Sequence, residues 1–565
     1  MITGSSSIPN HPREDNVSQL EKAEKEFGHL SSKEYLYVSQ HNANEPLPEP
    51  IVDEPPYFVF LVTYFNYLIL IIFGHIRDFF GKKFKPQEYE DVIEKNGYSP
   101  WYSGFESFYI RRMKMRIDDC FARPTCGAPG RITKCFHRIS KDYNRTYEYN
   151  GEVDECLNLA SYNYLGFAQS TGSCTANSVE TLLKYGSASG GPRNSSGTTD
   201  LHLECEEVIA KFVGKEAACV FSMGYSTNAN FFTSLANKRC LVISDELNHA
   251  SIRFGVRLSG AMVQVFPHND MDALEKLLRE QISNGHPRSH RPWSKIIVAV
   301  EGLYSMEGNI CNLPALIALK EKYKFYLFVD EAHSIGALGP HGRGVCDYFG
   351  VDPAKIDILM GTLTKSFGAA GGYISGNKEI IDRFKLDITT NSYGESIAPT
   401  VLAQIITSLK IIDGTLNGNE GKERLERIAF NSRYLRLGLK RLGFIVYGAD
   451  DSPVIPLLIY IPPKMPAFSR MMYKLGIATV VVGYPATSLT SSRARICVSA
   501  ALTKEDIDYV LRCCNEIGDK LFLKFSTGIG GGEKQKGDYE KGIVPRWDIE
   551  EVLERTPFDC KQIMY

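Results

Sequence analysis

The sequence predicts an α/β protein whose large domain is built on a mostly parallel sheet, with a smaller α+β domain after it and a hydrophobic helix before it. Three observations lead to this fold class. Between residues 155 and 412, short apolar runs alternate with amphipathic stretches, which is typical of a parallel sheet covered by helices on both faces. After that region the pattern restarts with a long basic and apolar helix. Near the N-terminus, residues 57–76 form an uninterrupted apolar segment.

The composition is that of a globular protein with room for two or three domains. The 565 residues include 64 Lys and Arg against 66 Asp and Glu, so the formal net charge is −2. Without a basic field, the chain is not expected to bind nucleic acid. The 14 cysteines are scattered and lack the C-x-x-C spacing of zinc sites. We therefore expect reduced thiols in a cytosolic body, and no metal site.

The N-terminal region divides into a polar arm and a hydrophobic helix. Residues 1–56 are polar, end in the Pro-rich and acidic NEPLPEPIVDEPP, and are predicted to be a disordered arm. The next segment, YFVFLVTYFNYLILIIFGHI, has no Lys, Arg, Asp or Glu and is about long enough to span a hydrocarbon core. It predicts membrane attachment as a spanning helix or, because of Asn66 and three tyrosines, as an interfacial one. A buried helix of a soluble protein is the alternative.

Charges on either side of this segment predict its orientation. Acidic residues come before it, and basic residues follow it at Arg77, Lys82, Lys83 and Lys85. Because basic residues favour the cytosolic side of a membrane, the C-terminal body is expected to face the cytosol.

The large domain is predicted at 155–412. Its strands are AACVFS, CLVIS, AMVQVF, KIIVAVEG, FYLFVDEAH, DILMGT and GGYISG, so the sheet is expected to have seven strands. Helical patterns such as DMDALEKLLREQI and LPALIALKEKY lie between them. Alternation of strands and helices predicts crossovers between mostly parallel strands.

Three further segments complete the predicted organisation. Residues 77–154 are interpreted as a linker and helical region. Residues 413–524 contain the long helix ERLERIAFNSRYLRLGLKRLGF and the apolar runs SPVIPLLIYI, ATVVVG and ARICVSA, which predict the small α+β domain. Residues 525–565 are predicted to be a flexible tail that ends in a short helix, RWDIEEVLERTP.

The stretch GTLTKSFGAAGG at 361–372 surrounds one lysine with small residues. Lys365 follows directly after an apolar run, with Thr362, Thr364 and Ser366 beside it and glycines behind it. Such glycines let the backbone approach a flat ligand closely. A lysine placed there is predicted to form a Schiff base.

Other polar residues also stand just after apolar runs, where ligands bind in open α/β sheets. Asp330 and His333 follow FYLFV, and His249 follows CLVIS. Gly224 and Tyr225 lie at a strand-to-helix turn, where backbone amides can bind phosphate. Considered singly, Asp330 is also explained as the cap of the next helix, and His249 as a capping or core residue.

Taken together, these residues predict a site for pyridoxal 5′-phosphate. That cofactor needs a lysine for its imine, an acid facing its ring nitrogen, donors for its phosphate and a flat partner for its ring. All four are present at predicted strand ends. An acid at the ring nitrogen keeps the ring protonated, which makes it an electron sink for a carbanion at the Cα of an amino acid.

The sequence also resembles the α-oxoamine synthases, which are fold-type I pyridoxal-phosphate transferases. The resemblance runs from NLASYNYLGFA at 158–168 to RICVSAALTKEDID at 495–508. Its motifs are DELNHAS, EGLYSMEG, VDEAHSIGALGPHGRGV, GTLTKSFGAAGGY and GYPAT. Within the family, the pattern is similar to the lysine-bearing subunit of the synthases that use serine, and this similarity extends to the apolar N-terminal segment and the RWDIEEV tail.

The resemblance implies roles for individual residues. Lys365 would hold the cofactor as a Schiff base and later move the Cα proton, while His249 would stack on the ring. Asp330 would pair with the ring nitrogen and His333 would contact the ring hydroxyl. The remaining cofactor-binding residues would be Thr362, Gly224, Tyr225 and Ser305.

The resemblance also implies residues for the substrate. Arg495 matches the arginine that binds the substrate carboxylate, a role suited to a bidentate guanidinium, and Arg493 on the same strand face is the reserve choice. SGGPRNSSGTTDLHLECE matches a segment that reaches the neighbouring subunit's site, so Arg193 and His202 are weaker candidates.

The implied reaction is the decarboxylative condensation of L-serine with palmitoyl-CoA or another long-chain acyl-CoA to 3-ketosphinganine, the first step of sphingolipid synthesis. The implied partners are a homologous non-catalytic subunit in an obligate heteromer, small activating and regulatory membrane subunits, and membrane lipid. The implied location is the endoplasmic reticulum membrane. Two alternatives remain: a 5-aminolevulinate synthase-like or other α-oxoamine synthase, which GGPRNSSGT also resembles, and a non-catalytic scaffold subunit, which would lack the lysine.

Overall fold

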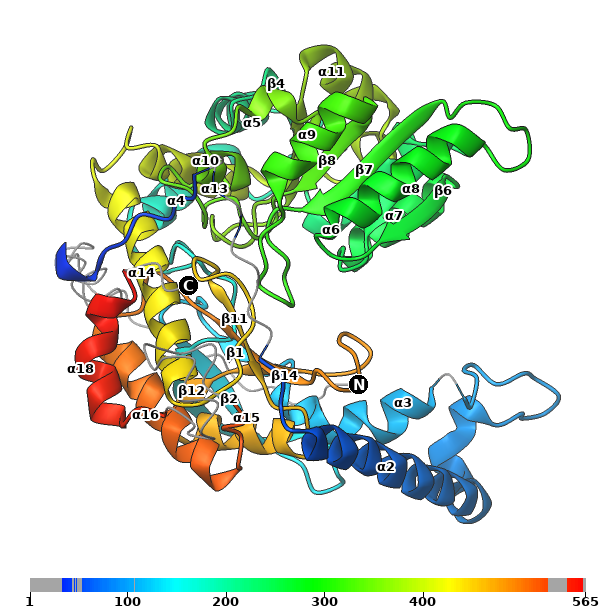
Figure 1. The fold of residues 1–565 in the computed structure, drawn as a ribbon, viewed down its shortest axis with the longest axis vertical. Helices are drawn as coiled ribbons and strands as arrows, with labels where there is room; N and C mark the ends of the chain where they lie inside the picture. Colours follow the sequence, from blue (N-terminus) through cyan, green and yellow to red (C-terminus); the bar gives the residue numbers. More distant parts are fainter. Residues whose placement is uncertain are drawn as a thin grey trace.

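The computed structural model of the chain describes residues 33–42, 45, 47, 53–105, 107–526 and 546–561. Most of the predicted N-terminal arm and much of the predicted flexible tail therefore lie outside the described residues. The described part forms two lobes, with a long helix along the base of one of them (Figure 1). One lobe contains a large sheet between helices, and the other contains two smaller sheets.

The large lobe is built on a seven-stranded, mostly parallel sheet, as the sequence predicted. Its strand order is β4-β10-β9-β8-β7-β5-β6. Only β10 is antiparallel to its neighbours. The bounds are β4 Ala217–Phe221, β5 Cys240–Asp245, β6 Met262–Phe266, β7 Lys295–Glu301, β8 Tyr326–Asp330, β9 Ile358–Thr362 and β10 Gly372–Gly376.

Helices cover both faces of this sheet, which explains why its central strands are apolar throughout. One hydrophobic cluster joins the sheet to α5, α8, α9 and α13, and another joins it to α6, α7 and α11. The helices of the lobe are α4 Ser173–Tyr185, α5 Asp200–Val213, α6 Gly224–Leu235, α7 Ala250–Ser259, α8 Met271–Asn284, α9 Leu313–Tyr323, α10 Val345–Phe349, η4 Pro353–Lys355, α11 Lys378–Asp387, α12 Thr389–Tyr393 and α13 Pro399–Ile412. Asp270 and Asn312 cap α8 and α9 by accepting a backbone N–H with their side chains.

In the part of the chain that the structure describes, the small lobe contains two sheets and four helices around a second core. One sheet has the order β1-β2-β3-β12 and the other β11-β14-β13. The strands are β1 Thr125–Cys126, β2 Ile132–Ile139, β3 Glu148–Asn158, β11 Val454–Leu458, β12 Ile477–Ala478, β13 Val480–Val482 and β14 Arg493–Cys497. The helices are α14 Glu420–Arg441, α15 Lys464–Lys474, α16 Lys504–Lys520 and α18 Ile549–Asp559. Because β3 pairs with β12, part of the region before residue 155 belongs to this lobe.

The apolar N-terminal segment forms α2, Tyr57–Phe84, which continues past the predicted end at residue 76. It is the one helix among the described residues that is long and apolar enough to cross a membrane. One face of α2 lies against the protein: Val59 packs with Ile445 and Leu458 of the small lobe. Among the described residues, one short helix precedes α2 in the chain, η1 Lys33–Tyr35. Three follow it: η2 Pro86–Val92, α3 Phe108–Arg112 and η3 Lys114–Cys120.

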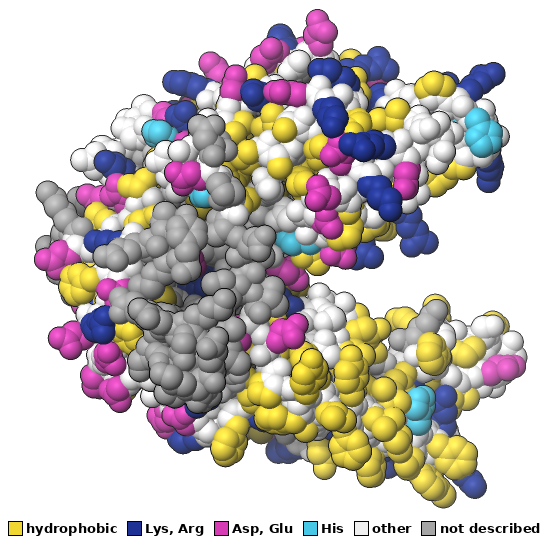
Figure 2. Space-filling model, viewed as in Figure 1, with side chains coloured by type: hydrophobic (Ala, Val, Ile, Leu, Met, Phe, Trp, Pro, Cys, Tyr) yellow, Lys and Arg dark blue, Asp and Glu magenta, His cyan; other side chains and the backbone are white. Residues whose placement is uncertain are grey.

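The second half of α2 is attached to α3 by buried charges. Asp78 of α2 forms ion pairs with Arg111 at 2.8 Å and with Arg112 at 2.6 Å. A Cβ on Gly74 would lie 2.6 Å from the ring of Phe108, so this position allows the two helices to approach closely. The helix is thus held along its length, and its opposite face is exposed and apolar (Figure 2).

Candidate active site

The predicted site residues converge where the strands of the large sheet end. Asp330 ends β8 and Thr362 ends β9. His249 begins α7 shortly after β5, and Gly224 begins α6 just after β4. Arg495 reaches the same region from β14 of the small lobe, because the side chains of Arg495 and Lys365 both contact the ring of Tyr162.

Lys365 lies in a turn between β9 and β10 that is fixed on both sides. Ser366 donates a hydrogen bond to the carbonyl of Ile335 at 2.6 Å. Gly368 has a φ of 61°, and a Cβ there would lie 2.5 Å from the backbone nitrogen of Ala168. The small residues around the lysine are therefore required by close packing.

The buried environment of Lys365 makes its ammonium easier to deprotonate than that of an exposed lysine. Burial lowers the pKa of its ammonium to about 8, with the charge of Asp330 opposing that effect and the charge of Arg495 adding to it. The Nζ lies 5.4 Å from the centroid of the Tyr162 ring. At pH 7 an amine with this pKa is deprotonated in about one molecule in ten, far more often than an ordinary lysine, and a nucleophile or base requires this neutral form.

Asp330 accepts two hydrogen bonds of the kind that an ionised carboxylate accepts. The side-chain amide of Asn228 donates to its Oδ2 at 2.7 Å, and the backbone N–H of Ala332 donates to its Oδ1 at 2.9 Å. The second bond is a local turn contact and not the cap of a helix, because the next helix among the described residues, α10, begins at Val345. The first connects Asp330 to α6, so the carboxylate also belongs to the site.

His333 is buried close to Asp330 and is held by a tyrosine. Its Nδ1 lies 2.7 Å from the hydroxyl of Tyr164. The ring of Tyr162 packs edge-on against it at 5.0 Å between centroids. Burial, together with the charges of Lys365 and Arg495, holds the pKa of His333 well below its usual value. The imidazole is therefore neutral and can donate or accept one hydrogen bond toward a ligand.

His249 both caps a helix and faces the site. Its Nδ1 accepts a hydrogen bond from the backbone N–H of Ser251 at 3.2 Å, which is the contact expected of a cap. Its own backbone N–H donates to the side chain of Glu301. Burial lowers the pKa of the ring, with a smaller contribution from Lys365 in the same direction. The ring of Tyr225 lies edge-on at 6.0 Å.

The turn that begins α6 approaches Thr362 closely. A Cβ on Gly224 would lie 2.6 Å from the Oγ1 of Thr362 and 3.3 Å from the carbonyl oxygen of Gly371. Among the described residues, no side chain caps the first turn of α6, and Thr362 shares a hydrogen bond of 2.8 Å with Thr364. Backbone amides at a helix start, beside two hydroxyls, suit a phosphate group.

The two candidate arginines of β14 differ in their hydrogen bonds. Arg493 donates to the carbonyls of Ser491 at 2.8 Å and Met306 at 2.9 Å, and it lies 3.6 Å from Glu307. Arg495 contacts the sulfur of Met306 at 3.7 Å and the face of Tyr162 at 4.6 Å. Its Nε is buried, and none of the described residues accepts a hydrogen bond from it. Arg495 thus retains donor capacity for a ligand.

Three other predicted residues lie at the margin of this constellation. Ser305 is part of the loop after β7, next to Met306. Arg193 is committed to an ion pair with Glu206 at 2.9 Å. The buried His202 caps α5, and burial lowers its pKa to about 4. Within one chain, the structure does not bring Arg193 or His202 to Lys365.

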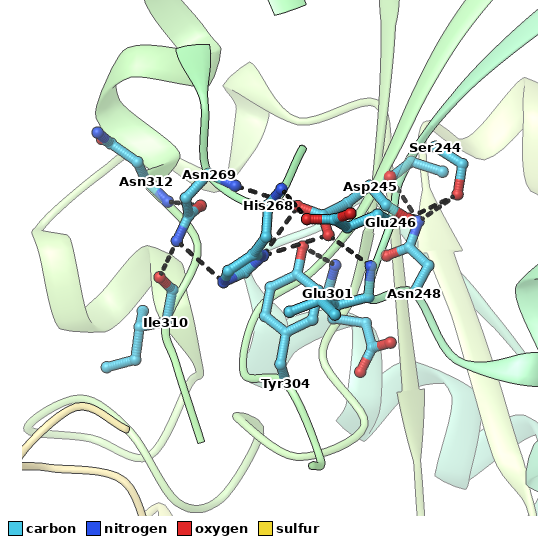
Figure 3. A network of polar contacts seen from close by, with 12 residues as sticks. Ser244, Asp245, Glu246, Asn248, His268, Asn269, Glu301, Tyr304, Ile310 and Asn312 are labelled. Atoms are coloured by element: carbon cyan, nitrogen blue, oxygen red, sulfur yellow. Dashed lines mark hydrogen bonds and ion pairs between the residues drawn. The ribbon is translucent and has the colours of Figure 1, made fainter. Parts of the chain in front are cut away.

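The loop after β7 is supported by a network of hydrogen bonds at the strand ends (Figure 3). The Nδ1 of His268 lies within hydrogen-bond distance of the Asp245 carboxylate, at 3.0 Å, and the ring packs edge-on against Tyr304. Asn248 donates to the carbonyl of Ala299 at 2.7 Å and to the hydroxyl of Ser244 at 2.9 Å. This network positions the backbone that carries His249.

Sequence reasoning missed Tyr162, Asn228, Glu301 and Met306. Tyr162 lies within NLASYNYLGFA, and Glu301 and Met306 lie within EGLYSMEG, so the motifs contained them without indicating which side chains face the site. Asn228 lies one helical turn into α6, and its contact with Asp330 spans 102 residues. No local pattern reveals such a contact.

The residues present fit pyridoxal phosphate. An anionic, phosphorylated ligand that bonds to an amine would use three of these features: the Arg495 Nε that lacks an acceptor among the described residues, the close approach of Gly224 to Thr362, and the lowered pKa of Lys365. Among the described residues, no group of His, Cys, Asp or Glu is arranged to hold a metal ion.

Comparison with known proteins identifies the family. The model of the family "Aminotransferase class I and II" matches residues 154–513. Serine palmitoyltransferase 2 of Kluyveromyces lactis is 62% identical over 562 residues, which cover 99% of both chains. Serine palmitoyltransferase 2 of Saccharomyces cerevisiae is 61% identical and covers 99% of this chain and 98% of its own. The chain belongs to the serine palmitoyltransferase family.

Members of the serine palmitoyltransferase family have also been solved as structures. A high-resolution structure of SPT with PLP is 28% identical, has a TM-score of 0.64, and covers 75% of this chain and all of its own. Serine palmitoyltransferase of Sphingomonas wittichii is 28% identical with a TM-score of 0.60, covering 67% of this chain and 90% of its own. The predicted resemblance and the predicted fold class are both confirmed.

Proposed function

We propose that this chain is the catalytic subunit of a serine palmitoyltransferase, which condenses L-serine with palmitoyl-CoA, releases CoA and carbon dioxide, and forms 3-ketosphinganine. The observation that carries the proposal is the convergence of Lys365, Asp330 and Arg495. Lys365 and Arg495 both contact the ring of Tyr162, and Asp330 ends β8, the strand beside β9. The presence of the lysine argues against a non-catalytic scaffold.

The residues gathered at the site are suited to hold pyridoxal phosphate. Lys365 would hold it covalently, Asp330 would face the ring nitrogen and His249 would lie against the ring. His333 would contact the ring hydroxyl, and the Gly224–Tyr225 turn would hold the phosphate together with Thr362. When bound, the cofactor supplies a conjugated ring that delocalises the charge left at the Cα of the amino acid.

Other residues would act on the substrate. Arg495 would bind the serine carboxylate with two parallel hydrogen bonds, because its Nε lacks an acceptor among the described residues and its guanidinium is fixed between Tyr162 and Met306. Once released, the Lys365 amine would be placed to remove the Cα proton, since a pKa of about 8 leaves part of it neutral at cytosolic pH. Arg493, which already donates to two carbonyls, would shape the strand.

The membrane contact would come from the exposed face of α2. Both halves of the helix are attached to the protein, at Val59 and at Asp78, so we propose that α2 lies on the bilayer surface and does not cross it. Its outward face has at least a dozen apolar side chains, including Leu61, Phe65 and Phe73. The location would be the cytosolic face of the endoplasmic reticulum membrane, with a homologous non-catalytic subunit and small membrane subunits as partners.

Absorbance spectroscopy tests the catalytic proposal. The purified complex should show the band of a lysine-bound cofactor, and the band should shift when L-serine is added. Lys365→Ala should remove that band and all turnover while leaving the melting temperature nearly unchanged, because the side chain supports chemistry more than packing. Glycine serves as the substrate control. A shift with glycine but not with serine would instead support an aminolevulinate synthase-like enzyme.

Liposome flotation tests the membrane proposal. Phe65→Asp and Phe73→Asp place charges on the outward face, and Tyr149→Asp, on an exposed strand position elsewhere, is the matched control. The two α2 variants should lose binding when the chain is expressed without partners, while the control keeps it. Equal flotation of all three would contradict the assignment of this face.

A further inference from the structure

The proposed mechanism leaves one buried acid of the site without a role. Glu301 ends β7 and is only 3% exposed. In the parallel pairing of β7 with β8, it stands directly opposite Asp330. Two buried carboxyl groups therefore occupy neighbouring strand ends beside Lys365, and two like charges in such a place oppose each other.

The hydrogen bonds distinguish the two acids. Asp330 accepts from a side-chain amide and a backbone N–H, which stabilise its ionised form. Glu301 accepts one backbone N–H, that of His249. Burial raises the pKa of Glu301 well above its usual range, and the charge of Asp330 raises it further. Among the described residues, Asp330 thus receives more of the hydrogen bonds that stabilise a carboxylate than Glu301 does.

Glu301 is also the connection between the sheet and His249. Its carboxyl group accepts from the backbone of His249, and its own backbone N–H donates to the hydroxyl of Tyr304 at 3.3 Å. Figure 3 shows Glu301 and Tyr304 beside Asn248, whose amide is fixed by two further hydrogen bonds. Through its hydrogen bond to the backbone of His249, the side chain of Glu301 helps to fix where the imidazole of His249 lies.

We propose that Glu301 is a positioning residue that works as a neutral carboxylic acid: it fixes the backbone of His249 and leaves Asp330 as the sole negative charge of the acid pair. The charged and titratable groups that face it are Asp330 on β8, Asp245 on β5, Lys365 after β9 and His249 at the start of α7. The proposal rests on the proposed function, because it assigns the stacking role to His249 and the ring-nitrogen role to Asp330.

The charge of Glu301 can be tested by substitution in the purified complex. Glu301→Gln keeps an oxygen that accepts from His249 and has no charge at any pH. We expect kcat and the serine KM within about threefold of the parent, with the same pH profile, since the hydrogen bond is retained. Glu301→Ala removes the acceptor, so activity should fall about tenfold or more and the cofactor absorbance should change. A large loss in Glu301→Gln with an altered pH profile would overturn the neutral state.

A second measurement does not depend on turnover. The infrared spectrum should contain a C=O band of a protonated carboxyl group that is absent from Glu301→Gln, and an unchanged spectrum would overturn the proposal. If Glu301→Ala does not fold, Glu301→Asp replaces it: the shorter side chain should weaken the contact with His249, and wild-type absorbance and activity in that variant would count against positioning. Failure of the parent complex to respond to serine would contradict the proposed function, while the infrared band would still report on Glu301.

Discussion

Several side chains of the site serve the fold and the chemistry at once. The Nδ1 of His249 caps α7, while its ring faces Tyr225 at the edge of the site. Asp330 accepts from the next turn with one oxygen and from Asn228 with the other. The capping interpretation of His249 was therefore compatible with its functional one, whereas Asp330 stabilises a turn and not the start of a helix among the described residues.

The role of Asp330 can be tested with Asp330→Asn. The amide keeps the size of the side chain but cannot stabilise a protonated ring nitrogen by charge. Activity should fall roughly 10- to 100-fold, the range expected for a lost charge-assisted hydrogen bond, while the cofactor remains bound. Steady-state kinetics and the absorbance of the purified complex measure both. Near-normal activity would exclude Asp330 as the acid at the ring nitrogen.

Arg495 and Arg493 make a matched pair for substrate binding. Arg495→Lys should raise the serine KM about tenfold and leave the KM for acyl-CoA nearly unchanged, because an ammonium cannot form the bidentate contact. Arg493→Lys should mainly lower the melting temperature, since Arg493 donates to the backbone of Ser491 and Met306. The reverse pattern would assign the carboxylate to Arg493.

At the scale of elements, periodicity predicted the strands and missed contacts between distant segments. The seven apolar runs are the seven strands, because a buried parallel strand must be apolar on both faces. The end of α2 was placed at residue 76, where charged residues begin, but the helix continues to Phe84. The helix can continue through Asp78 because Arg111 and Arg112 neutralise its charge. The sequence did not predict this continuation, since a contact across more than 30 residues leaves no local pattern.

The attachment of α2 to α3 depends on that carboxylate. Asp78→Asn leaves two largely buried guanidinium groups without a counter-charge, so the protein should lose about 3–5 kcal/mol of stability. Glu90→Gln, which breaks the exposed pair with Lys95, is the control and should cost no more than about 1 kcal/mol. Thermal or denaturant unfolding of the two variants gives the comparison. Equal midpoints would show that the ion pairs do not hold the helix.

At the scale of the whole molecule, the site lies at the junction of the two lobes. The 158–168 segment, which carries Tyr162, is bound to the small lobe: Ser499 donates to the carbonyl of Asn163 at 2.6 Å, and the backbone N–H of Ala500 donates to that of Tyr164 at 2.7 Å. The sequence showed two domains and placed candidate residues in both. It could not show that Tyr162 contacts both Lys365, which belongs to the large lobe, and Arg495, which belongs to the small lobe. That contact depends on how the two lobes are placed relative to each other.

Loosening this junction should affect serine more than the cofactor. Ser499→Ala removes a hydrogen bond worth about 0.5–1.5 kcal/mol, so the serine KM should rise roughly two- to tenfold through displacement of Arg495. Cofactor affinity should be unchanged, because the phosphate turn and Asp330 belong to the large lobe. Kinetics and a cofactor titration separate the two. A loss of cofactor affinity with an unchanged serine KM would contradict this division.

The antiparallel direction of β10 has a consequence for how the chain can vary. Thr362 at the end of β9 pairs with Gly372 at the start of β10, so residues 363–371 close a hairpin whose two ends are fixed in the sheet. Both strands are fully buried, and shifting either by one residue would turn its side chains to the opposite face. A single inserted or deleted residue around Lys365 would therefore have to be absorbed within the hairpin. The length of this segment should be far less tolerant of change than its composition.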